Sequence, residues 1–180
     1  MNNRLRLAAA LCFLCLYLNS HHARGLDKDE CVIEAFTICS GTQLASANLS
    51  GANLWGAVLT DADLTGAHLS RAILSSANLS GADLTHTRLF EANLSSAILF
   101  QARLVKANLG NANLSGANLE FANLENASLL NANLAGTNLG GANLRGAALA
   151  GANFDSKTIF TTGFDPAAAG MIYVDKPATP

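Results

Sequence analysis

The chain has 180 residues, a formal net charge of −2, 50% hydrophobic residues and only 6% aromatic residues. Its length suits one domain with a core of its own. The near balance of 11 basic and 13 acidic residues excludes a basic surface for nucleic acid or anionic membranes, and a strongly acidic surface that mimics DNA.

The N-terminal segment, residues 1–25, is typical of a secretory signal peptide. Arg4 and Arg6 form a basic region, residues 7–18 form an apolar run, and Ala23 and Gly25 are the small residues of a cleavage site after Gly25. Cleavage after Ala23 and an uncleaved anchor are alternatives. No segment reaches the ~20 apolar residues of a spanning helix. We expect an exported protein, periplasmic or secreted, with no membrane span after cleavage and, with eight basic against 13 acidic residues left, a charge of −5.

Residues 26–41 are predicted to form an N-terminal cap. Cys31 and Cys39 are the two cysteines that remain after cleavage, and an exported protein meets an oxidising compartment. A disulfide between them would fix the cap to the rest of the domain. Two separate buried thiols are the alternative.

Leucine occupies every fifth position from Leu44 to Leu149, 22 times in succession. Alanine lies two residues before each leucine, except where Thr42, Thr87 and Thr137 replace it. Five residues of α-helix rotate by about 140°, which would scatter the leucines. In a flat strand an odd repeat would send successive leucines to opposite faces. The period therefore predicts a chain that turns a corner after each five-residue unit and stacks into a solenoid.

Within each unit, alanine and leucine share the inner face of a short extended segment, and their neighbours point outward. The fifth residue lies at the corner. Glycine is frequent there, and glycine tolerates the positive φ of tight corners; these corner glycines are Gly51, Gly56, Gly66, Gly81, Gly116, Gly136, Gly141, Gly146 and Gly151.

Runs such as Ala77-Asn78-Leu79-Ser80-Gly81 and Ala112-Asn113-Leu114-Ser115-Gly116 resemble the pentapeptide-repeat family over about residues 42–154. The resemblance implies an all-β fold: a right-handed quadrilateral parallel β-helix of about six 20-residue coils with short caps at both ends. We assign residues 42–164 to this β-helix, with Phe154, Ile159 and Phe164 as looser inward centres. A 20-residue coil would also place Asp83 beside Arg103, Arg71 beside Glu91, and Glu125 beside Arg145.

Residues 165–180 leave the pattern and are predicted to form a C-terminal cap or tail. Pro166 and the alanines after it allow a helical turn, and Met171, Ile172, Tyr173 and Val174 could add a short strand. Because some members of the resembled family form dimers through this end, a homodimer through these four residues is a further hypothesis.

The outward positions give no sign of catalysis. Asp63 and Asp83 would stack, but a single pair flanked by a cation is a weak signal. No catalytic, cofactor-binding or metal-binding residues are therefore predicted, and Thr60, Thr65 and Thr85 are too few for an ice-binding array.

Apolar residues at outward positions are the main functional clue. Val58, Ile98, Phe100 and Phe121 should share one face and are the candidate partner surface. Scattered surface hydrophobes, or contact with a terminal segment, are the alternatives. The sequence thus predicts an exported, non-enzymatic scaffold for an unknown protein or envelope partner, without nucleic acid. The alternative is a DNA-mimicking topoisomerase-interacting member of the same family, which the export signal and near-neutral rod disfavour.

Overall fold

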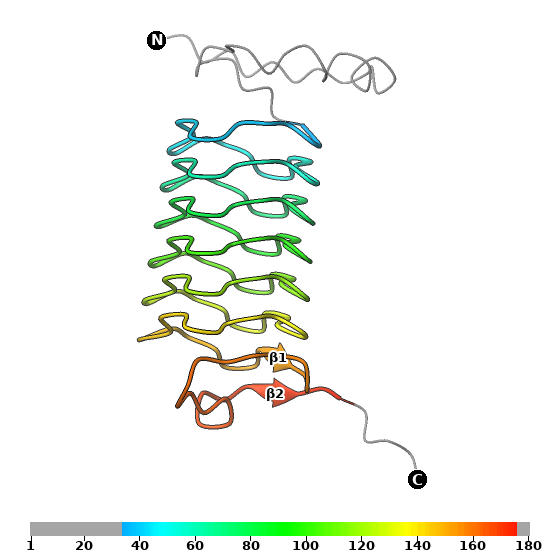
Figure 1. Cartoon of the computed structure of the whole chain (residues 1–180), viewed down its shortest axis with the longest axis vertical. Helices are drawn as coiled ribbons and strands as arrows, with labels where there is room; N and C mark the ends of the chain where they lie inside the picture. The colour runs from blue at the N-terminus through cyan, green and yellow to red at the C-terminus, as the bar shows by residue number, and fades with distance from the viewer. Residues whose placement is uncertain (1–33, 176–180) are drawn as a thin grey trace.

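The computed structural model describes residues 34–175, which form a rod of stacked coils (Figure 1). The predicted signal peptide, Cys31 and the last five residues lie outside the described part of the chain. Signal cleavage and the disulfide from Cys31 to Cys39 therefore stay predictions. Residues 34–175 contain no helix, and so none long and apolar enough to cross a membrane.

Each side of a coil meets the next coil through a single bridging residue. Parallel bridges join residues 20 apart, from Ile38 with Val58 to Asn133 with Asn153. Since the unit is five residues long, this spacing makes four sides and confirms the predicted 20-residue coil. The first bridge begins at Ile38, inside the segment predicted as the N-terminal cap. Only at the C-terminal end of the described chain do two strands form, β1 (Asn153–Phe154) and β2 (Ile172–Tyr173), which pair in parallel.

The leucine ladder fills the inside of the rod, as predicted. Every repeat leucine from Leu49 to Leu139 is buried, and nearly all are 0% exposed. The alanines of the same units also point inward, and threonine is buried at the same place at Thr42, Thr87 and Thr137. Burial of each leucine contributes roughly 1.5 to 3 kcal/mol relative to exposure. The ladder is therefore the main source of stability in a chain with few aromatic residues.

Every corner of the ladder has a residue with positive φ two positions after the leucine, as predicted. The turn closes when the leucine carbonyl accepts a hydrogen bond from the alanine three residues on, for example Ala77 N to Leu74 O at 3.0 Å. Glycine is not required, because Arg71, Lys106 and Phe121 occupy corners at φ of 61°, 56° and 58°. Such residues cost roughly 1 kcal/mol or more each in this region, so the stacked coils impose the conformation.

The asparagine that precedes many of the leucines has a structural role that was not predicted from the sequence. Its side-chain oxygen accepts a hydrogen bond from the backbone N–H two residues on, as in Ser80 N to Asn78 Oδ1 at 3.1 Å. Asp63 does the same for Thr65, at 3.0 Å, and hydrogen bonds from the Thr65 hydroxyl and amide lower the pKa of Asp63. Asparagine and aspartate are thus turn-closing residues in this repeat.

One extra residue interrupts the period near the C-terminal end. Asn138 pairs with Ile159, whereas the regular spacing would select Thr158, and Ile159 is 55% exposed. The prediction of Ile159 as an inward centre is therefore wrong, because the extra residue brings Phe160 into that place. Phe160 packs against Phe154 and Phe164, with ring centroids 5.5 and 5.1 Å apart, so aromatic rings replace leucine at this end.

The side chain of Asp155 compensates for the shift in register. Its Oδ1 accepts hydrogen bonds from Gly136 N at 2.7 Å and from the Thr158 hydroxyl at 2.9 Å. In the regular coils the amide at the position of Gly136 donates to a backbone carbonyl of the next coil. Burial acts to raise the pKa of Asp155, but hydrogen bonds from Gly136, Thr158 and Lys157 outweigh it and lower that pKa.

Candidate functional site

The bridging residues stack in four columns, one on each face of the rod, and we name each face after its first bridging residue. The Ile38 face carries Ile38, Val58, Asn78, Ile98, Asn118, Asn138 and Ile159; the Gln43 face carries Gln43, Asp63, Asp83, Arg103, Asn123 and Asn143. The Asn48 face carries Asn48, His68, Arg88, Asn108, Ser128 and Ala148; the Asn53 face carries Asn53, Ile73, Asn93, Asn113, Asn133, Asn153 and Ile172.

The Ile38 face is the most apolar of the four. Four of its seven bridging residues are aliphatic, whereas the Gln43 face has none. Ile38 and Ile98 are 68% and 41% exposed, so these side chains meet solvent rather than the core. An exposed apolar column on a rod is the kind of surface that partners bind.

The predicted partner residues Ile98, Phe100 and Phe121 come together on or beside this face, and we call them the Phe100 patch. Phe100 and Phe121 pack edge to face with ring centroids 5.9 Å apart. Phe121 stands at the corner that borders the face, is 55% exposed, and lies over Gly141 of the next coil. The structure therefore brings these three predicted residues together at a fixed place on the rod.

Val58, the fourth predicted residue, lies in the same column but apart from the Phe100 patch. Asn78 stands between Val58 and Ile98 in the column, and Val58 bridges to Ile38 on its other side. Phe36 and Trp55, near this end of the rod, pack with ring centroids 4.6 Å apart and are 56% and 46% exposed. Phe36 and Ile38 were not predicted as part of this surface, because the predicted β-helix begins at Thr42. The sequence contains a signal for Ile38, since Ile38 precedes Val58 by 20 residues, which is one full coil.

Two of the three predicted cross-coil ion pairs form. Arg71 Nε lies 2.7 Å from Glu91 Oε2, and Arg103 Nε lies 3.4 Å from Asp83 Oδ2. The bond to Glu91 raises the pKa of Arg71. Glu125 and Arg145 form no ion pair within 4.0 Å, although Asn126 N donates to Arg145 O and the coils are in register. Within residues 34–175, no group of acidic, histidine and cysteine residues could hold a metal ion.

The predicted cap segment at the C-terminal end divides into a buried and an exposed part. Met171 is 9% exposed and closes the core, whereas Ile172, Tyr173 and Val174 are 52%, 56% and 43% exposed. The Tyr173 hydroxyl donates to Asp175 Oδ2 at 2.9 Å, and this bond is the main cause of a raised pKa for Tyr173. The end of the Asn53 face thus presents three exposed and largely apolar side chains, those of Ile172 and Tyr173 in β2 and that of Val174 after it.

Comparison with known proteins agrees with this geometry. The model of the pentapeptide-repeat family matches with 8 copies, in overlapping segments that run from residue 37 to residue 156. No curated protein matches this chain.

Two of the solved structures that resemble this chain are about one third identical to it in sequence. A pentapeptide repeat protein from the Arabidopsis thaliana thylakoid lumen is 33% identical over 52% of this chain and 66% of its own, with a TM-score of 0.51. The match thus spans just under two thirds of that relative. HetL, a pentapeptide repeat protein involved in heterocyst differentiation regulation in the cyanobacterium Nostoc sp. strain PCC 7120, is 32% identical over 77% of this chain and 70% of its own, with a TM-score of 0.44.

A third structure, QnrB1, a plasmid-mediated fluoroquinolone resistance protein, is only 18% identical, over 79% of this chain and 86% of its own, with a TM-score of 0.46. Pentapeptide-repeat proteins are generally structural repeat proteins rather than enzymes. The family model covers well over half of the sequence. The chain therefore belongs to the pentapeptide-repeat family and folds as its right-handed quadrilateral β-helix.

Proposed function

We propose that the chain is an exported, non-enzymatic scaffold that binds a protein partner through its Ile38 face. The observation that carries the proposal is the Phe100 patch, in which a 55% exposed Phe121 is held edge to face against Phe100. Exposed aromatic side chains on a rigid support lose little conformational freedom on binding, so they are efficient anchors for a partner.

The surroundings of the patch support this use. Asn78 and Asn118 lie on either side of Ile98 in the column, and a polar rim around an apolar centre is typical of protein interfaces. The backbone below is fixed by coil-to-coil hydrogen bonds such as Leu99 N to Asn118 O at 2.7 Å. The partner would therefore meet a preformed surface.

Export rests on the signal-like residues 1–25, and a relative from the thylakoid lumen supports an exported setting for this fold. A fusion of residues 1–25 to a reporter that is active only outside the cytoplasm tests this part. N-terminal sequencing of the exported chain should begin at Leu26, or at Arg24 if cleavage follows Ala23. Retention of the full-length chain in the cytoplasm would contradict it.

The alternative of topoisomerase binding by DNA mimicry finds little support in the charges. Residues 42–164 carry seven acidic and six basic residues, whereas a DNA mimic needs dense negative charge along the rod. A supercoiling assay with purified gyrase, a fluoroquinolone and this chain is expected to show no protection. Protection at equimolar chain would favour the alternative.

The binding proposal is tested by cross-linking the exported chain in its own compartment and identifying what it captures. The test variant combines Phe100→Ser and Phe121→Ser. The matched control combines Ile73→Ser and Leu130→Ser, which remove two side chains that are each 43% exposed outside the Phe100 patch. A cross-link lost in the test variant and kept in the control is the expected result. Equal capture by both variants would reject the Phe100 patch as the site.

Self-association through strand β2 is a separate part of the proposal. Its support is the apolar and exposed outer surface of Ile172, Tyr173 and Val174. Sedimentation velocity should show a dimer that Ile172→Glu converts to a monomer, while Met171 stays buried and the fold intact. A monomer in the unchanged protein at high concentration would reject it.

A further inference from the structure

On the Gln43 face, no residue of the described chain bridges to Asn143 from the C-terminal side. From Asp63 on, the same three backbone bonds recur around each bridging residue of this face. Around Asp83, Asp83 N donates to Ala62 O at 2.9 Å, Leu64 N to Asp83 O at 2.8 Å, and Gly66 N to Thr85 O at 2.8 Å. The same three bonds recur around Asn143, at 2.9 Å each. Beyond Asn143 they stop: Ala142 O, Leu144 N and Gly146 N have no hydrogen-bond partner within residues 34–175.

Each of the other three faces is closed by at least one backbone bond at this end. The closing bonds are Ile159 N to Thr137 O at 2.9 Å on the Ile38 face, Gly151 N to Gly170 O at 2.9 Å on the Asn48 face, and Ile172 N to Ala152 O at 2.8 Å on the Asn53 face. After Ile159 the described chain bends at Gly163, whose φ is +82°, and makes no backbone bond to Ala142, Leu144 or Gly146. Residues 161–164 therefore form a wall beside the end of the Gln43 face instead of covering it.

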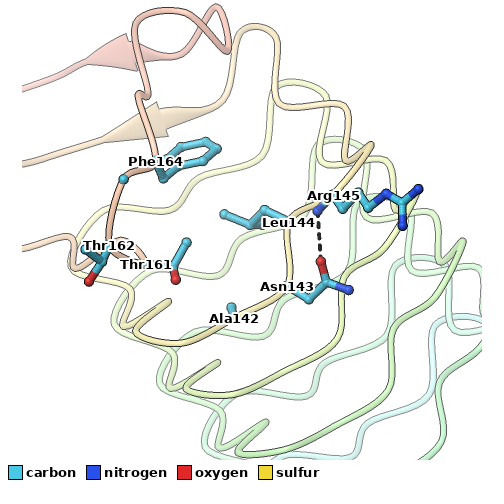
Figure 2. Close-up of a pocket in the computed structure, with 8 residues that line it drawn as sticks. Ala142, Asn143, Leu144, Arg145, Thr161, Thr162 and Phe164 are labelled. Atoms are coloured by element: carbon cyan, nitrogen blue, oxygen red, sulfur yellow. Dashed lines mark hydrogen bonds between the residues drawn. The ribbon is translucent and has the colours of Figure 1, made fainter.

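An open hollow of about 350 Å³ results, lined by Ala142, Leu144 and Phe164, with Thr161 and Thr162 on its far wall. Figure 2 shows the Leu144 and Phe164 side chains directed toward each other across it, while Arg145 extends away at its edge. Leu144 is only partly buried, unlike Leu124 one coil earlier. The floor is therefore apolar, and its rim carries unpaired backbone groups.

Arg145 gives the rim a charge preference. It is exposed and forms no ion pair within 4.0 Å in the described part of the chain. The regular coil would place the residue 20 positions on, Asp165, next to it. Asp165 instead accepts hydrogen bonds from Ala167 N and Ala168 N, at 2.9 and 3.1 Å. A cation beside the hollow thus lacks the acid that the period would supply.

From this geometry we infer that the hollow binds an extended segment of another protein, which adds the missing coil in parallel register. One residue of the segment donates its N–H to Ala142 O and accepts from Leu144 N. The residue before it is small and lies over Ala142, the residue after it is aliphatic and lies over Leu144, and the next is acidic and faces Arg145. The ligand is thus a peptide of the form small, any, aliphatic, acidic, bound by strand addition.

This site lies on a different face from the Phe100 patch, so it goes beyond the proposed function and can fail independently of it. The sequence of the preceding coil provides a model for a test peptide. Ala122, Asn123, Leu124 and Glu125 occupy the corresponding place one coil earlier. An acetylated and amidated peptide, Ser-Ala-Asn-Leu-Glu-Ser, reproduces that segment.

The test is a titration of the ¹⁵N-labelled chain with this peptide, followed by amide chemical shifts. Saturable shifts are expected at Leu144, Gly146 and residues 161–164, with none at Leu99. A peptide with an N-methyl group on its asparagine cannot donate to Ala142 O and should bind about fivefold more weakly, the effect of one hydrogen bond. Replacing the peptide leucine by aspartate should abolish the shifts.

A charge exchange tests the role of Arg145 without touching the core. Arg145→Glu should weaken binding of the glutamate peptide about threefold and favour a peptide with lysine in that place. Arg88→Glu, on the Asn48 face, is the matched control and should leave the preference unchanged. The absence of shifts at the peptide's solubility limit, or shifts insensitive to both N-methylation and charge exchange, would overturn the inference. Shifts that appear on concentrating the protein alone would assign the hollow to a second copy and overturn it too.

Discussion

The backbone N–H and C=O groups find their hydrogen-bond partners in different ways in the central coils and at the C-terminal end of the rod. In the centre, each coil supplies the acceptors and donors of the next at the constant spacing of four repeat units, and the core is aliphatic. At the C-terminal end the spacing is one residue longer from Asn138 to Ile159 and one residue shorter from Asn153 to Ile172. There, side chains such as Asp155 replace backbone acceptors.

The difference shows that the repeat stabilises itself only where another coil follows. A pentapeptide unit leaves open backbone groups at its outer edge, and stacking satisfies them. Where stacking stops, these backbone groups must form hydrogen bonds with specific side chains, or they remain without a protein partner, as Ala142 O and Leu144 N do within residues 34–175. The regular part of the chain therefore specifies the fold, whereas the irregular part contains the side-chain hydrogen bonds that are particular to this protein.

The largest expected effect compares a central with a terminal leucine. Leu99 is 0% exposed, so Leu99→Asp would bury an unpaired charge and cost at least about 4 kcal/mol. Leu144→Asp, at the open hollow, keeps access to water and should cost about 1 kcal/mol. Thermal unfolding followed by circular dichroism measures both. Similar losses would show that the C-terminal end is as tightly built as the centre.

The corners provide a second test. Gly116 and Gly141 have the same φ of +66°, but an added Cβ would lie 3.6 Å from Ser96 at the first and 2.5 Å from the Phe121 ring at the second. Gly116→Ala should cost about 1 kcal/mol and Gly141→Ala about 2 to 3 kcal/mol, because the ring must move. Chemical denaturation measures the difference. It should vanish when Phe121→Ala is present in both variants, and its persistence would reject the steric explanation.

Threonines at inward positions give a smaller contrast. The Thr87 hydroxyl makes one bond, to Leu64 O at 2.9 Å. The Thr158 hydroxyl shares its one proton between Leu134 O at 3.0 Å and Asp155 Oδ1 at 2.9 Å, and it also accepts from Asp155 N at 3.0 Å. Replacement by valine keeps the shape, so Thr87→Val should cost about 1 kcal/mol and Thr158→Val about 2 kcal/mol. Equal costs in denaturant unfolding would mean that Thr158 does not hold the shifted register.

The smallest effect is a local response to acid. Asp155 and Asp175 have lowered pKa values in the folded chain; hydrogen bonds from the Ser156 and Tyr173 hydroxyls lower that of Asp175. An aspartate whose pKa is lower in the folded chain than in the unfolded chain stabilises the fold at pH values above its unfolded pKa, near 4. This stabilisation is lost as the pH falls through the folded pKa. Hydrogen-exchange protection of Gly136 and Ser156 should therefore fall as the pH decreases below about 4, while that of Leu99 changes less.

The control for this response replaces both acids by asparagine. Asp155→Asn with Asp175→Asn should remove the pH dependence at Gly136 and Ser156. A Gly136 amide that loses protection equally in this variant would show that other groups titrate there.

The sequence predicted the parts of the fold that repeat. The inward alanines and leucines, the corners and the ion pairs of Arg71 and Arg103 follow from the five-residue unit and the four-sided coil. Ile159 was assigned inward because it follows Phe154 by one five-residue period, and the extra residue that moves Phe160 into that place is visible only in the three-dimensional register. Glu125 and Arg145 do not pair although their coils stack, since long exposed side chains gain little from an ion pair in water.

Of the two candidate sites, one could be predicted from the sequence and the other could not. The meeting of Ile98, Phe100 and Phe121 could be predicted, because all three lie within regular coils. The hollow beside Leu144 could not, because it depends on where the chain leaves the ladder at Gly163.

The constant coil length makes the angular position of a side chain a function of residue number. Removal of one whole coil from the centre would shorten the rod and leave every remaining side chain on its face. Removal of a single repeat unit would instead rotate all residues beyond the deletion by a quarter turn about the axis, without changing the core. Two binding surfaces on this molecule could therefore be set at chosen relative angles by deletions or insertions of single units, which would separate the effect of their orientation from that of their chemistry.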